Sequence, residues 1–133
     1  MPTLVVDTDV VSYLFRSDSR ALLYLPDLQD AVPVITFQTV AELHFWTLTR
    51  QWGAARQAQL QAHLRQFAVQ PWELDLCRLW AEVRYACQQR GRRIRSADAW
   101  HAATARYLDA PLLTHNRRDY DAVPDLVVIS DAP

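Results

Sequence analysis

A chain of 133 residues, half of them hydrophobic, is long enough to bury one core, so we expect a single domain over residues 1–133 that needs no disulfide for its stability. The net charge of −1 excludes the strong overall positive charge by which many nucleic-acid-binding proteins attract a polyanion. No apolar run approaches the length of a membrane-spanning helix, which predicts a protein without a membrane partner.

Apolar runs of strand length alternate along the chain with longer segments of helical period. Strands are expected at residues 3–6, 34–37, 67–69, 112–114 and 126–129, and helices at 10–15, 21–28, 40–50, 54–67, 74–90 and 97–108. Gly91 follows the longest helical segment and is typical of a helix end. Apolar strands separated by helices favour an α/β fold in which a short central parallel sheet is covered on both faces.

The two cysteines, Cys77 and Cys87, fall in one predicted helix. Ten helical residues separate them by ~15 Å, which is too far for a disulfide. The amino-terminal residues lead directly into a strand and show no basic and apolar pattern of a secretory signal. These features predict a cytoplasmic protein.

The first candidate for a functional site is Asp7, directly after the first predicted strand. Ligands of parallel sheets bind beyond the carboxyl ends of the strands, where this carboxylate meets the preference of Mg²⁺ or Mn²⁺ for oxygen ligands. The helix expected to begin near Val10 needs an N-cap, and Asp9 suits that position. We therefore predict a metal ligand at Asp7 and a structural role for Asp9.

Glu42 closes the tetrad that begins at Thr39, a pattern typical of a capping box. The helix that would begin there follows the second strand, so its amino end opens on the same edge of the sheet. The sequence leaves both roles open for Glu42, helix cap and metal ligand.

Asp98 lies in the first turn of an alanine-rich predicted helix for which Ser96 can act as N-cap. An anion is favourable there by roughly 0.3–1 kcal/mol, which gives Asp98 a structural explanation. The small alanines allow the helix to lie close to the sheet and bring Asp98 toward the strand ends. His101 shares this face, and we expect it to be a packed or supporting residue because oxygen-rich sites seldom use imidazole.

The segment after the fourth strand offers further polar side chains, any of which can also be an ordinary turn residue: Thr114, Asn116, Asp119 and Asp121. Carboxylates at three or four strand or helix ends that open on one edge would repel each other, and a divalent ion relieves this repulsion. Such a site can activate water as the nucleophile of an in-line displacement and hold the phosphate.

Four stretches of the sequence resemble, in order and spacing, the signature stretches of PIN domains, and most closely those of the VapC toxins of toxin–antitoxin pairs: Val5-Val6-Asp7-Thr8, Thr39-Val40-Ala41-Glu42-Leu43, Ala97-Asp98-Ala99-Trp100-His101-Ala102-Ala103 and Leu113-Thr114-His115-Asn116-Arg117-Arg118-Asp119-Tyr120. The resemblance spans nearly the whole chain. It implies a PIN-like three-layer sandwich, dependence on Mg²⁺ or Mn²⁺, endonucleolytic cleavage of RNA, a homodimer and inhibition by an antitoxin.

Position by position, the resemblance implies that Asp7, Glu42, Asp98 and Asp119 form the acidic catalytic and metal site, with Thr8, Thr114 and Asn116 in support. The chain departs from the family at three positions. Asp9 stands where the family most often has Asn, Asn116 occupies a place that is often acidic, and Tyr120 replaces the usual Phe.

Two alternatives remain. The opening Asp7-Thr8-Asp9-Val10-Val11 also fits haloacid-dehalogenase-like phosphatases, in which Asp7 would be the nucleophile and Asp9 the general acid. That family is larger and carries an essential basic residue and an acidic pair that are not evident here. A PIN-like scaffold that binds a partner without catalysis is the other alternative, and the presence of both Asp7 and Asp98 argues against it.

All 14 basic residues are Arg. Arg92, Arg93 and Arg95 precede the helix that carries Asp98, and Arg117 and Arg118 lie in the loop before Asp119. We expect these arginines at the rim of the acidic site, where guanidinium groups suit the phosphates of RNA; a solvated helix end is the alternative. Phe45, Trp46 and Trp52 give one helix more aromatic surface than a single buried stripe requires, which is consistent with a dimer or with burial in the core.

Overall fold

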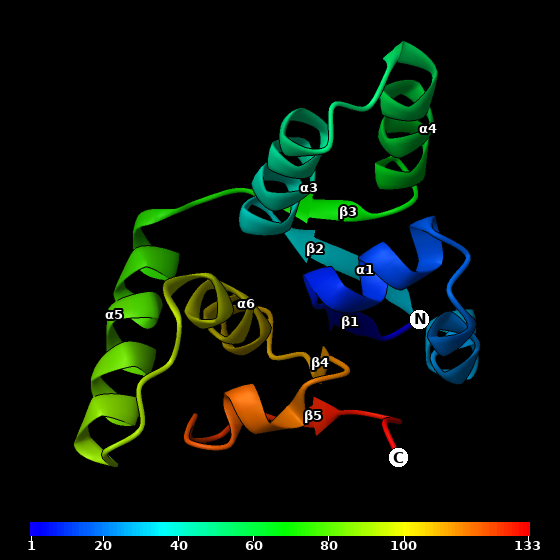
Figure 1. Ribbon diagram of the computed structural model, residues 1–133. Coiled ribbons are helices and arrows are strands. Elements are labelled where there is room, and N and C mark those ends of the chain that lie inside the picture. The colour runs from blue at the N-terminus through cyan, green and yellow to red at the C-terminus, as the bar shows by residue number, and fades with distance from the viewer.

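The computed structural model describes residues 1–133 and contains one parallel sheet with the strand order β3-β2-β1-β4-β5 (Figure 1). The strands are β1 (Thr3–Val6), β2 (Val32–Thr36), β3 (Ala68–Gln70), β4 (Leu112–Leu113) and β5 (Val128–Ile129). β1 lies at the centre, where Val5 is in register with Val34 of β2 and Leu112 of β4. The predicted parallel α/β sheet is confirmed, although β4 and β5 are shorter than expected.

The first three connections between strands contain α-helices and one 3₁₀ helix: α1 (Thr8–Phe15), the 3₁₀ helix η1 (Ser19–Leu23), α2 (Leu25–Gln29), α3 (Phe37–Thr49), α4 (Ala54–Leu64), α5 (Leu74–Gln89) and α6 (Ser96–Tyr107). A second 3₁₀ helix, η2 (Arg117–Tyr120), follows β4. The prediction of one helix over 21–28 was wrong, because η1 and α2 are separate elements. Pro26 lies in the first turn of α2, where a missing N–H costs no helical hydrogen bond. In the interior of one helix over 21–28 the same proline would remove a hydrogen bond and clash with the preceding turn.

The side chains of the central strands alternate between the two faces of the sheet. Val5 and Leu112 belong to the buried cluster that includes residues of α5 and α6. Leu4 and Val6 belong to a second cluster on the other face, which includes residues of α1, α3 and α4. The molecule is therefore a three-layer sandwich, with α5 and α6 side by side in one layer (Figure 1).

α5 ends as its sequence predicts. Gly91 has a φ of +71°, a left-handed conformation that glycine adopts without steric cost. The N–H groups of Gly91 and Arg92 donate to the carbonyls of Gln88 and Cys87, which closes the last turn of α5. This turn reverses the chain so that α6 returns against the sheet with Asp98 in its first turn.

Buried alanines line the face of α6 that lies on the sheet: Ala99, Ala102, Ala103 and Ala105. Their small side chains permit the close approach that the sequence indicates. Both cysteines are free. None of the helices combines the length and the apolar character that crossing a bilayer requires.

Candidate metal centre at the carboxyl edge of the sheet

A cavity of about 150 Å³ lies beyond the carboxyl ends of β1, β2 and β4. It is bordered by the first turns of α1 and α6, by α3 and by the segment after β4. Its lining contains all four acids of the predicted site, together with further polar residues and one Trp: Asp7, Thr8, Asp9, Glu42, Trp46, Arg95, Asp98, His101, Asn116 and Asp119. The rule that ligands bind at the carboxyl edge of a parallel sheet thus gave the correct place for the acids.

Asp7 is buried, with 6% of its surface exposed, at the point where β1 passes into α1. Its N–H donates to the carbonyl of Leu113 at 2.9 Å, which ties the residue to β4. Oδ1 accepts a hydrogen bond from the N–H of Thr8, and Oδ2 accepts hydrogen bonds from the hydroxyls of Thr114 and Tyr120, both at 2.8 Å. Three donors therefore hold this carboxylate in one orientation.

The prediction that Asp9 is the N-cap of this helix was wrong. α1 begins at Thr8, two residues before the predicted start, so Asp7 is itself the N-cap residue. Asp9 lies in the first turn, and its Oδ2 accepts hydrogen bonds from the N–H of His115 and the amide of Asn116, both at 3.0 Å. Asp9 thereby joins α1 to the segment after β4. Burial and the nearby charge of Asp7 raise the pKa of Asp9 to about 7.

Asp98 lies opposite Asp7 in the first turn of α6, with 4% of its surface exposed. Arg95 donates to both carboxylate oxygens, at 3.1 and 3.4 Å, and Tyr120 donates to Oδ1 at 3.3 Å. The pairing with Asp98 raises the pKa of the Arg95 guanidinium. Ser96 is the first helical residue rather than the expected N-cap, because the chain is extended at Arg95, and no side chain caps this helix.

His101 completes a buried group with the two acids. Asp7, Asp98 and His101 each offer a ligand atom, and these atoms lie within 4.8 Å of one another. The imidazole Nδ1 lies 3.1 Å from the hydroxyl of Thr36, and Nε2 lies 3.5 Å from Asp7 Oδ1. These contacts place His101 in support of Asp7, in line with its expected role as a packed or supporting residue.

Glu42 is not part of a capping box. α3 begins at Phe37, and its cap is Thr36, whose hydroxyl accepts a hydrogen bond from the N–H of Thr39. Glu42 consequently lies in the second turn, half-buried at the cavity, where Oε1 accepts a hydrogen bond from Gln38 at 3.0 Å. The capping alternative for Glu42 was wrong, which leaves its carboxylate directed to the site.

Asp119 reaches the cavity from η2 and is more exposed than Asp7 and Asp98. Partial burial and the negative charge of Asp98 raise its pKa, and the positive charge of Arg95 opposes this rise. Asp121 lies outside the cavity, 3.5 Å from the guanidinium of Arg92. Of the acids after β4, Asp119 is therefore the one at the site.

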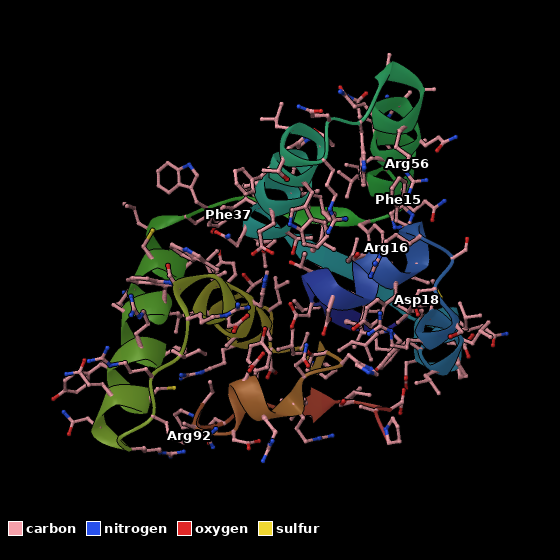
Figure 2. All side chains as sticks on the ribbon, in the orientation of Figure 1. Phe15, Arg16, Asp18, Phe37, Arg56 and Arg92 are labelled. Carbon is pink, nitrogen blue, oxygen red and sulfur yellow. The ribbon has the colours of Figure 1, made fainter.

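A smaller cavity of about 100 Å³ adjoins the acidic one and shares Arg95, Asp98 and Asp119 with it. Its lining also contains Arg92, Arg93 and Arg118, whereas Arg117 lies in a different hollow. Figure 2 shows Arg92 beyond the end of α5, far from Arg56, whose guanidinium lies 4.5 Å from the ring of Phe15. Some arginines of this chain thus cover aromatic rings, and another group surrounds the acids.

The residues of the centre fit a hard divalent cation. Two buried carboxylates from different elements face each other, and Glu42 and Asp119 add oxygen donors at the same cavity. Oxygen donors of this kind are the preferred ligands of Mg²⁺ and Mn²⁺, while a lone imidazole does not indicate a zinc site.

The sequence reasoning missed the role of two kinds of residue. The sequence marks Tyr120 only as a residue that replaces the usual Phe, although its hydroxyl contacts both buried acids. Thr36 and Thr39 were not expected at the site, and they link to it through His101 and Thr8. A signal existed for Thr36, which is the last residue of β2, since Asp7 and Thr114 directly follow β1 and β4.

Comparison with known proteins agrees with this architecture. Residues 4–126 match the sequence profile of the PIN domain. The structure is similar to a chain of VapBC-1 from nontypeable Haemophilus influenzae, with a TM-score of 0.85, 22% identity and coverage of 97% of this chain and 98% of that one. No curated protein matches the sequence.

Two further solved structures show the same fold. A chain of VapBC2 from Rickettsia felis has a TM-score of 0.84 at 19% identity, covering 96% of this chain and 98% of that one. A chain of VapBC-5 from Mycobacterium tuberculosis, a member of the VapBC family of toxin–antitoxin systems, has a TM-score of 0.71 at 27% identity, covering 97% and 99%. With a profile match over most of its length, an α/β sandwich of the same fold and four acids gathered at the carboxyl edge of the sheet, this chain belongs to the PIN domain family.

Proposed function

We propose that this protein is a divalent-metal-dependent endoribonuclease and the toxin component of a toxin–antitoxin pair. The observation that carries the proposal is the pair of buried carboxylates, Asp7 and Asp98, that face each other at the carboxyl edge of the sheet. A pair of buried acids is costly unless a cation or donors compensate the charge. The membership of the PIN domain family supports the nuclease activity.

In this proposal Asp7 and Asp98 bind the cation, Mg²⁺ or Mn²⁺, with Glu42 and Asp119 as further acidic ligands or as acceptors for the attacking water. The bound ion supplies Lewis-acid stabilisation of the phosphate and lowers the pKa of water. Thr8, Thr114 and Asn116 act through hydrogen bonds: Thr114 orients Asp7, Thr8 links Asp7 to α3 through Thr39, and Asn116 holds Asp9.

The arginine-lined cavity beside the acids supports RNA as the substrate. We assign Arg92, Arg93 and Arg118 to phosphates that flank the scissile bond, since their guanidinium groups border the cavity that adjoins the acidic one. Arg95 is already paired with Asp98 and would contact RNA from that position. Arg117 lies next to Arg118 and lines a different hollow, further from the acids. A local group of arginines explains how a chain of net charge −1 holds a polyanion.

The partners follow from the relatives. Several solved structures of this fold are VapBC toxin–antitoxin proteins, which supports a cognate antitoxin for this chain and a place in the cytoplasm. Phe45 is 62% exposed on α3 and supports self-association into a homodimer. Trp46 and Trp52 contribute less to such a surface, because both are half-buried and Trp52 packs against Phe15.

The geometry disfavours the phosphatase alternative. A general acid next to a nucleophilic Asp7 has to present its carboxyl to the leaving group. Asp9 instead uses both oxygens for hydrogen bonds, Oδ1 with the N–H of Val10 and Oδ2 with His115 and Asn116. This carboxyl is therefore a structural link.

The test is a cleavage assay on single-stranded RNA with Mg²⁺ or Mn²⁺. We expect cleavage that stops with EDTA and falls at least about 100-fold in Asp7→Asn and in Asp98→Asn, because each change removes charge from the ion site. Asp27→Asn, which lies outside the site, is the charge-matched control and should cleave normally; circular dichroism checks the fold of each variant. Undiminished cleavage by either site variant, or turnover of a phosphomonoester without RNA cleavage, contradicts the proposal.

A binding assay with the same RNA tests the role of the arginines. Replacing Arg92 and Arg93 together by Ala should weaken RNA binding and flatten its salt dependence by roughly one unit of slope per lost phosphate contact. Wild-type affinity and slope in this variant would place the RNA-binding surface elsewhere.

A further inference from the structure

Tyr120 is the last residue of η2, and its side chain reaches into the acidic centre from the protein interior. Only 2% of its surface is exposed, and it belongs to the buried cluster that includes residues of α5 and α6. The surrounding core fixes the ring, so its hydroxyl has a defined position.

That hydroxyl lies between the two buried acids. It donates to Oδ2 of Asp7 at 2.8 Å and lies 3.3 Å from Oδ1 of Asp98. One phenolic proton is thus shared unequally by two carboxylates that come from different elements, the start of α1 and the first turn of α6.

Each of the other donors at the centre contacts only one member of the Asp7–Asp98 pair. Thr114 and the N–H of Thr8 contact Asp7, and Arg95 contacts Asp98. Tyr120 alone donates to both, so it is the one side chain whose hydrogen bonds can set the distance between Asp7 and Asp98 and the angle between their carboxylate planes.

We propose that Tyr120 is a positioning residue that fixes the spacing and orientation of the Asp7–Asp98 pair for a divalent cation. The inference rests on the proposed function, since it assigns a residue behind the same ion site. Residues that hydrogen-bond metal ligands from behind orient those ligands, and their loss typically weakens metal binding 10–100-fold.

A purely structural role predicts a different result. The ring of Tyr120 fills the core, and a buried hydroxyl contributes to folding wherever it finds a partner. Tyr120→Phe keeps the ring and removes only the hydroxyl, so a structural role would lower the melting temperature and leave the affinity for the cation unchanged.

Tyr24 provides the matched control. It is fully buried, and its hydroxyl makes one short hydrogen bond, 2.6 Å from Nδ1 of His115, without contact to Asp7 or Asp98. Tyr24→Phe therefore removes the same group from an equally buried ring outside the ion site.

The experiment measures Mn²⁺ binding by titration calorimetry on whole protein that has been freed of metal with EDTA. We expect Tyr120→Phe to bind Mn²⁺ at least about tenfold more weakly than wild type, and Tyr24→Phe to bind as wild type does. RNA cleavage by Tyr120→Phe should recover when Mn²⁺ is raised in proportion.

Equal or tighter Mn²⁺ binding by Tyr120→Phe overturns the positioning role while the ion site itself stands. An equal loss of affinity in Tyr24→Phe also overturns it, because the effect is then one of general stability. Absence of Mn²⁺ binding by the wild-type protein contradicts the ion site, and with it the proposed function.

Discussion

Two pairs of carboxyl groups in this molecule differ in how the repulsion between their negative charges is relieved. Asp7 and Asp98 are buried at the centre of the sheet edge, and hydroxyl, amide and guanidinium donors surround them. Asp27 of α2 lies beside Asp131 near the carboxyl terminus, and a hydrogen bond between the two carboxyl groups, more than burial, raises the pKa of Asp27 to about 6.

In our proposal the difference separates a site that binds a cation from a pair that takes up a proton. Around Asp7 and Asp98 the protein supplies donors from four separate segments of the chain, which lowers the cost of keeping negative charge in the interior. At Asp27 and Asp131 no arginine or hydroxyl contributes to the shift, and only a shared proton relieves the repulsion. The two pairs thus differ both in burial and in the donors around them.

The largest expected effect is stabilisation by a metal. A cation that binds only the folded state stabilises it by about 2.7 kcal/mol when its free concentration is 100 times the Kd. Mn²⁺ should therefore raise the melting temperature of the wild type. Asp98→Asn should lose this increase.

Asp27→Asn is the control in the same melting experiment and should keep the whole increase, because the Asp27–Asp131 pair is no cation site. If Mn²⁺ stabilises Asp98→Asn as much as the wild type, or if Asp27→Asn loses the increase, the distinction between the two pairs is wrong.

An intermediate effect is expected from the donors themselves. Thr114→Val keeps the shape of a fully buried side chain but removes the hydroxyl that donates to Asp7 and accepts from the N–H of Asn116. We expect a loss of about 1–3 kcal/mol in the free energy of unfolding, measured by urea denaturation without metal.

Thr104→Val is the matched change on α6. The hydroxyl of Thr104 is buried without a hydrogen-bond partner, so its removal should cost little or be stabilising. Equal losses in the two variants would show that the hydroxyl of Thr114 does not act through Asp7.

The smallest effect concerns pH. Because the pKa of Asp27 is raised from 3.8 to about 6, the folded state binds more protons than the unfolded state between these values. The contribution of Asp27 to stability is therefore complete below pH 4 and is lost as the pH rises through 6. Solvent screening at this partly exposed position keeps the change below about 1 kcal/mol.

Asp27→Asn should remove this part of the pH dependence, as followed by urea denaturation between pH 4 and 8. Asp30→Asn, which removes a charge from the same segment, should retain it. A pH profile of Asp27→Asn identical to that of the wild type would contradict the shared proton.

The strands were predictable from the apolar runs. The edge at which the acids gather was predictable because Asp7, Glu42, Asp98 and Asp119 each follow a strand or lie near the start of a helix. Helix starts were less predictable. Asp7 and Asp9 both suit an N-cap, and only the contacts of Asp9 with the segment after β4 decide between them. Local propensity cannot supply a contact between residues more than 100 positions apart.

The same limit applies to Tyr120 and to Arg95. A phenol in place of a phenylalanine changes neither hydropathy nor periodicity, and its importance lies in the position of one oxygen atom. Arg95 belongs to an arginine-rich stretch that equally predicts a solvated turn. Its pairing with Asp98 depends on the turn at Gly91 and on the depth at which α6 packs on the sheet.

The position of β1 at the centre of the sheet has a consequence for biosynthesis. β1 is translated before its neighbour β4, and Thr114, Asp119 and Tyr120 follow Asp7 by more than 100 residues. Until then a nascent chain carries Asp7 without the hydroxyl donors of Thr114 and Tyr120 and without Asp119. The acidic centre is therefore complete only after the segment that follows β4 has been translated and has folded against β1.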